Sequence, residues 1–100
     1  MIRMSKSPTN ETLHAVVIVA FDTSSGRLHG TFVHGSYGGP DATGVRRSRE
    51  RLLEDLRGRA ASGVTLDAIE HPLAELGDGW IEHVDPKTRK PVMRRDARPI

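Results

Sequence analysis

Cysteine is absent from this chain of 100 residues, and its aromatic side chains are limited to two Phe, one Tyr and one Trp. The lack of cysteine excludes a disulfide scaffold, a thiolate metal site and a cysteine nucleophile. The apolar run Ala15–Phe21 is far shorter than the roughly 20 residues that a membrane-spanning helix needs. The first ten residues also lack the apolar core of a signal peptide. We therefore expect one soluble, cytoplasmic domain with no membrane partner, and a modest core of Val, Leu and Ile.

Positive charge is missing from residues 60–86, which hold six acidic residues and no Lys or Arg. Residues 87–100 then carry six basic residues against the single Asp96, so the net charge of +2 hides a strong separation. Such an asymmetry is typical either of a site for an anionic partner or of two neighbouring strands that pair by charge. We expect a flexible segment over residues 1–11, a single domain over 12–94 and a basic tail over 95–100.

The strongest structural pattern is a β-hairpin. Leu13–Phe21 is rich in β-branched residues, Asp22–Gly26 has the composition of a turn, and Arg27–Tyr37 is a second extended run. If Asp22 faces Arg27, one face of the hairpin carries Val17, Phe21 and Phe32. The opposite face then carries Val16, Ile18, Val33 and His29. Both faces are partly apolar, so the second face needs a cover from this chain or from another.

The remaining patterns complete an α+β fold of order ββαβββ: two hairpins, one extra strand and a single helix packed on an antiparallel sheet. A glycine-rich loop over residues 35–44 leads to a helix over Val45–Ala61, with Asp41 and Thr43 as candidate N-caps. A third strand follows at Val64–His71, then a connector at residues 73–79. The strands Trp80–Val84 and Arg89–Arg95 flank a turn whose Asp85-Pro86 start favours type I geometry. In the order of its elements, the segment 13–57 resembles the core of HicB-type antitoxins, although the glycine-cysteine element of that family's loop is missing.

No catalytic signature accompanies these elements. The five histidines (His14, His29, His34, His71, His83) have no ligand spacing, so we expect neither a metal site nor a cofactor. The loop over residues 35–44 could offer backbone N–H groups to a phosphate, but it lacks the Gly-Lys-Ser/Thr end of a P-loop. We find no arrangement of nucleophile, base and orienting group. The sequence therefore favours a protein that is not an enzyme.

Two functions follow from these patterns. The first is a protein-interaction module that docks to a partner protein, or to itself as a homodimer, through the 13–34 hairpin and the face of Val16, Ile18, Val33 and His29. The alternative is a nucleic-acid-binding protein that uses the basic 87–98 segment together with a stacking aromatic ring. Its contact residues would be Trp80, Arg89, Lys90, Arg94 and Arg95. The competing interpretation of the basic segment is charge pairing with the acidic strand before it.

Overall fold

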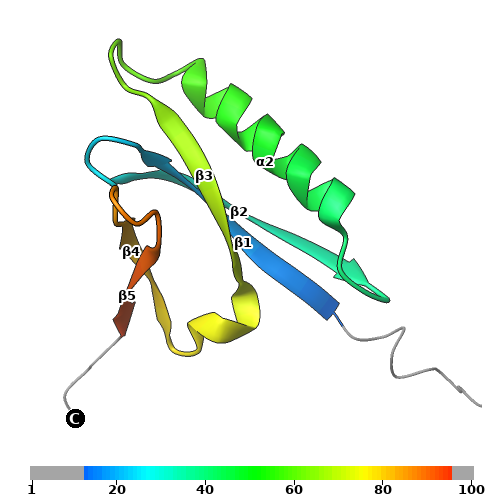
Figure 1. Cartoon of the computed structure of the whole chain (residues 1–100). Helices are drawn as coiled ribbons and strands as arrows, with labels where there is room; N and C mark the ends of the chain where they lie inside the picture. The colour runs from blue at the N-terminus through cyan, green and yellow to red at the C-terminus, as the bar shows by residue number, and fades with distance from the viewer. Residues whose placement is uncertain (1–12, 96–100) are drawn as a thin grey trace, which may run out of the picture.

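A computed structural model of the chain describes residues 13–95, which form two antiparallel sheets and one α-helix in the order ββαβββ (Figure 1). The predicted α+β fold class is confirmed. The elements are β1 (Leu13–Asp22), β2 (Leu28–Tyr37), α2 (Ala42–Arg57), β3 (Leu66–Pro72), the 3-10 turn η1 (Leu73–Leu76), β4 (Gly79–Val84) and β5 (Pro91–Arg95). The predicted segment 1–11 and residues 96–100 of the predicted tail lie outside the described residues, whereas Arg95 is the last residue of β5.

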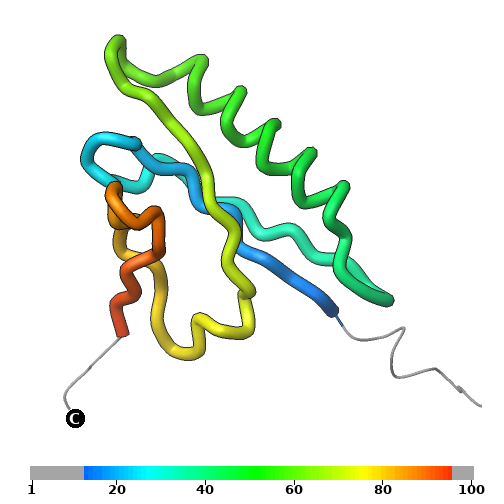
Figure 2. Tube along the Cα trace, in the orientation of Figure 1, coloured from blue at the N-terminus to red at the C-terminus, as the bar shows by residue number. Residues whose placement is uncertain are grey.

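The strands form two sheets and not a single one. The central sheet has the order β2-β1-β3, so β1 is its middle strand and β2 and β3 are its edges. The hairpin of β4 and β5 is a separate two-stranded sheet. Helix α2 lies along one face of the central sheet, and the second hairpin lies across the other face (Figure 2).

Helix α2 begins and ends earlier than the sequence predicts. Asp41 is the N-cap, because its side chain accepts a hydrogen bond from the Gly44 N–H at 3.0 Å, and the helix starts at once with Ala42. The helix ends at Arg57, with Gly58 as the C-cap, and does not reach Ala61. Of the two candidate caps, Asp41 is confirmed and Thr43 lies inside the helix, so the predicted range 45–61 is displaced toward the C-terminus.

Both faces of β1 are buried by this chain. Ile18 and Ala20 pack beneath α2 against Val45 and Leu53. On the other face, Phe21 packs in a cluster of the second hairpin and its neighbours, whose members are Val17, Val19, Ile81 and Val84, with Leu28, Ile69 and Leu76 at its margin. The cover that the Val16 and Ile18 face requires is thus supplied by α2, and the Val17 and Phe21 face is covered by β4–β5. Burial on both faces explains why β1 reads as an almost continuous apolar run.

The predicted register of the first hairpin is wrong beyond its turn. Phe21 faces Leu28 as expected, but Ala20 faces Gly30, so His29 is an extra residue in β2. This β-bulge shifts all later pairs by one residue, and Ile18 therefore faces Phe32 while Val17 faces Val33. A shift of one residue exchanges the faces of a strand, so the bulge moves Phe32 to the helix side and Val33 to the opposite side.

The second hairpin is attached to the central sheet at two points. Gly26, in the first turn with φ 80°, accepts a hydrogen bond from the Val84 N–H at 2.9 Å, and a side chain at Gly26 would collide with Val84. Arg89, with φ 61°, forms an ion pair with Asp67 of β3, and its guanidinium lies 5.6 Å from the centre of the Phe21 ring. These contacts hold an unfavourable left-handed backbone at Arg89 and fix the hairpin across the sheet.

Candidate functional site: the outer edge of strand β2

The structure does not bring the four predicted docking residues onto one surface. Ile18 has no exposed surface, since it lies under α2, and Val16 packs against the same cluster. Val33 is 51% exposed on the other face, and the exposed His29 is the bulge residue. Val16 is half-buried, and of the predicted set only Val33 and His29 are exposed; both belong to β2.

Strand β2 is an open edge of the central sheet. It pairs with β1 on one side, and among the described residues no strand pairs with it on the other. The Asp22 N–H donates to the Arg27 carbonyl and the Asp22 carbonyl accepts from the Gly26 N–H, so both backbone groups of Asp22 point toward β2. Backbone groups alternate in direction along a strand, and these bonds therefore set which residues of β2 bond to β1. By that alternation the backbone groups of Thr31, Val33 and Gly35 point away from β1. Strand β2 therefore presents a row of donors and acceptors that is available to another strand.

The side chains of β2 lack the devices that usually protect an edge. Its ten residues, LHGTFVHGSY, contain no Asp, Glu, Lys, Arg or Pro. Phe32, Val33 and Tyr37 are 47%, 51% and 69% exposed, respectively. Phe32 emerges on the helix side, and Val33 and Tyr37 emerge on the other side, so the strip is apolar above and below the strand. Apolar exposure on both sides of a bare edge is typical of a pairing surface.

The opposite edge of the same sheet, β3, is covered. The Arg49 guanidinium donates to the Ala68 carbonyl at 3.1 and 3.2 Å, and that of Arg57 donates to the Leu66 carbonyl at 3.1 Å. Both carbonyls lie on the outer side of β3, because the neighbouring Thr65 carbonyl points the other way and accepts from the N–H of Thr23, the residue after β1. Helix α2 thus caps β3 with its own arginines and leaves β2 without an equivalent among the described contacts.

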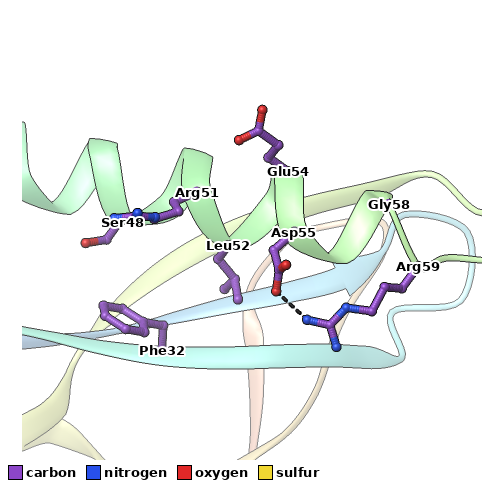
Figure 3. Close-up of a pocket in the computed structure, with 8 residues that line it drawn as sticks. All are labelled: Phe32, Ser48, Arg51, Leu52, Glu54, Asp55, Gly58 and Arg59. Atoms are coloured by element: carbon purple, nitrogen blue, oxygen red, sulfur yellow. Dashed lines mark hydrogen bonds and ion pairs between the residues drawn. The ribbon is translucent and has the colours of Figure 1, made fainter.

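A groove runs between β2 and α2 along the open edge (Figure 3). It has a volume of about 810 Å³ and is lined by Phe32, Leu52 and a polar helix face that includes Arg51, Asp55 and Arg59. Asp55 and Arg59 form an ion pair across one helical turn, and Figure 3 shows the Phe32 ring on the strand side, toward the Ser48 end of the groove. The groove can accept side chains of a strand placed beside β2.

A polar chain of contacts fastens the start of α2 to β2. His34 lies between Asp41 and Ser48, with 3.0 Å from Nε2 to the Asp41 carboxylate and 3.0 Å from Nδ1 to the Ser48 hydroxyl. The Gly44 N–H and then the His34 ring lower the pKa of Asp41, because both stabilise its carboxylate form. The sequence indicates Asp41 as a cap, but the bulge at His29 decides that His34 faces the helix, so sequence reasoning missed this cluster.

The same carboxylate occupies the helix N-terminus that a phosphate would need, which removes the basis for an anion cradle.

The predicted nucleic-acid contacts are spread over the second hairpin and are partly neutralised. Arg89 pairs with Asp67, and Arg94 pairs with Glu82 at 3.2 Å. The Arg94 guanidinium also lies 6.0 Å from the Trp80 ring, which is 46% exposed. Lys90 and Arg95 are exposed. The pairing of Glu82 with Arg94 agrees with the interpretation of the charge separation as cross-strand pairing.

Within residues 13–95, no group of three His, Asp or Glu side chains is placed to hold a metal ion. Helix α2 is too short and too polar to be a transmembrane span, and the described part of the chain has no other candidate helix. Comparisons of the chain with models of protein families, with curated proteins and with solved structures find no match.

Proposed function

We propose that this protein is a non-enzymatic interaction module that docks to a protein partner through the β1–β2 hairpin. The docking surface is the outer edge of β2, and the occupant is an extended strand that continues the central sheet. The observation that carries the proposal is the bare, uncharged edge of β2 with Phe32 and Val33 half exposed on its two sides. In this mode of recognition, backbone hydrogen bonds supply affinity and alternate side chains supply specificity.

The chemistry of the occupant follows from the surroundings of the edge. Its backbone must bond to Thr31, Val33 and Gly35, so it must be extended and free of proline at the paired positions. Side chains on its helix-facing side enter the groove beside Phe32 and Leu52, and those on its other side meet Val33. We therefore expect an apolar strand without a strong net charge.

A synthetic peptide with the sequence of residues 28–37 is a suitable probe, because it is extended, uncharged and apolar on both sides. We expect saturable shifts of the amide signals of Thr31, Val33 and Gly35 in NMR titrations with labelled protein. The matched control is the same peptide with Val33→Pro, which lacks one pairing donor and should bind more weakly. The proposal is contradicted if neither this peptide nor a second copy of the chain changes those amides, or if both peptides act equally.

The second candidate is nucleic-acid binding through the basic 87–98 segment. It is supported by the exposed Trp80 ring with Arg94 beside it, and the ion pairs of Arg89 and Arg94 count against it. Titration of labelled single- and double-stranded oligonucleotides should then give an affinity that falls steeply with salt, and Arg94→Ala with Arg95→Ala should reduce the slope. Absence of binding at low salt would exclude this function.

A further inference from the structure

The open edge of β2 has one occupant that the chain itself provides. We propose that the edge pairs with β2 of a second copy, in an antiparallel arrangement about a two-fold axis beside Phe32, to form a continuous six-stranded sheet. This inference rests on the proposed function and adds the identity of the partner. It follows from the symmetry of the strand, from the charges along the groove and from the closure of the other edge.

The pairing geometry of β2 fits a second copy of the same strand. An axis beside Phe32 places Phe32 opposite Phe32 of the second copy and Thr31 opposite Val33 of that copy. Thr31 and Val33 are two of the residues whose backbone groups point outward, so their donors and acceptors meet in this register. The two Phe32 rings come together as a cross-strand aromatic pair on the helix side, where each is now 47% exposed.

The charge along the groove is compatible with a second copy. Helix α2 runs back over β2, so Ser48 lies over His34 and Leu56 lies over Gly30. A two-fold axis at Phe32 therefore sets the Arg51 end of the groove against the Asp55 end of the second groove. The groove contains two basic residues, Arg51 and Arg59, and two acidic residues, Glu54 and Asp55, so no excess of one sign opposes the approach of a second copy.

Closure of the other edge limits the assembly to two copies. A two-fold pairing of β2 with β2 uses both β2 edges, so the sheet could grow further only through β3. Here Arg49 and Arg57 occupy the outer carbonyls of β3, and β3 also carries Asp67 and Glu70. A second copy on β2 thus gives a closed pair with β3 at both ends, and not a fibre.

Sedimentation velocity over a concentration series tests this assembly directly. We expect the wild-type mass to approach that of a dimer as concentration rises, and Val33→Lys to shift the dissociation constant upward by on the order of tenfold or more through edge charge. Met93→Lys is the matched control, because Met93 is 40% exposed on β5 and should leave association unchanged. Circular dichroism of each variant confirms that it is folded.

The axis is tested by a single cysteine, since the chain contains none of its own. In the proposed register Phe32 occupies a non-hydrogen-bonded pair, where the Cα atoms lie about 4.5 Å apart, close enough for a disulfide. Oxidised Phe32→Cys should form a covalent dimer, whereas Met93→Cys should form no covalent dimer under the same conditions. Equal cross-linking of the two variants would overturn the proposed axis.

The outcomes separate the inference from the function on which it rests. A wild-type monomer at all concentrations, with the 28–37 peptide still bound at Thr31 and Val33, would refute the second copy and retain the docking edge. A monomer that also ignores the peptide would refute both. A dimer that persists in Val33→Lys but is lost in Met93→Lys would assign the interface to β5 and overturn the inference.

Discussion

The two edges of the central sheet differ in whether their outward backbone groups have hydrogen-bond partners. Strand β3 has seven residues, two of them acidic, and its outer carbonyls accept hydrogen bonds from arginines of α2. Strand β2 has ten residues, none of them acidic, lysine or arginine, and its outer groups have no partner in the described part of the chain. One helix thus protects one edge and leaves the other available. The same helix that covers the β3 edge leaves the β2 edge uncovered, so the two edges of one sheet differ in their availability for pairing.

The side chains around the two edges agree with this division. On the β3 side, Asp67 accepts from Arg49 at 2.9 Å and also pairs with Arg89 of the second hairpin. On the β2 side, the polar contacts of His34 point inward to Asp41 and Ser48, and hold the helix without touching the outer backbone. Polar side chains therefore cover the outer backbone of β3, whereas the His34 side chain of β2 bonds only to the helix and its N-cap and leaves the outer backbone of β2 uncovered.

The largest effect is expected from proline placed within β2. Phe32→Pro removes a donor that bonds to β1 and should lower the free energy of unfolding by about 2 to 3 kcal/mol. Val33→Pro removes an outward donor and should cost less than about 1 kcal/mol. Urea denaturation measures both, and Phe32→Ala isolates the loss of the ring. Similar losses at the two positions would show that the outer side of β2 is not free.

A smaller effect is expected from uncovering β3. Arg49→Met keeps the length of the side chain but removes its hydrogen bonds to Ala68 and Asp67, and should destabilise the protein by about 2 kcal/mol. The newly exposed edge should also increase the mass observed by light scattering at high concentration. Arg46→Met, at an exposed helix position, is the control and should stay within about 0.5 kcal/mol of the wild type. Equal effects of the two substitutions would mean that Arg49 does not cap the edge.

The smallest effect concerns pH and the contact of Asp41 with His34, which joins the start of α2 to β2. The pKa of Asp41 is lowered in the folded state by the Gly44 N–H and by His34, so the unfolded chain takes up a proton before the folded one does. The stabilisation is complete above the unfolded pKa and is lost as pH falls from about 4 through the folded pKa. Asp41→Asn keeps a good N-cap without the charge, so its urea midpoint should fall less steeply in acid than that of the wild type. Parallel acid profiles would contradict this role of the carboxylate.

The local chemistry of the sequence was sufficient for the element order, the turn and the cap. The extended runs interrupted by Asp22–Gly26 and by Asp85–Thr88 form hairpins, because Gly26 permits the positive φ of the first turn and Pro86 fixes φ in the second. Asp41 caps the helix because the required N–H belongs to Gly44, only three residues along the chain. The pairing of Glu82 with Arg94 is similarly a consequence of one short hairpin.

The tertiary structure alone decided which residues form the candidate site. Next to the extra residue His29, Gly30 lies under Leu56, where a side chain would collide with the leucine. This contact joins parts of the chain that are distant in the sequence. The shift that His29 introduces exchanges the faces of Phe32 and Val33, which the alternating pattern had assigned the other way. Whether an edge is open also depends on where α2 places Arg49 and Arg57. A strand's own residues specify its turns and caps, but its register and its neighbours are set by packing energies that involve the whole chain.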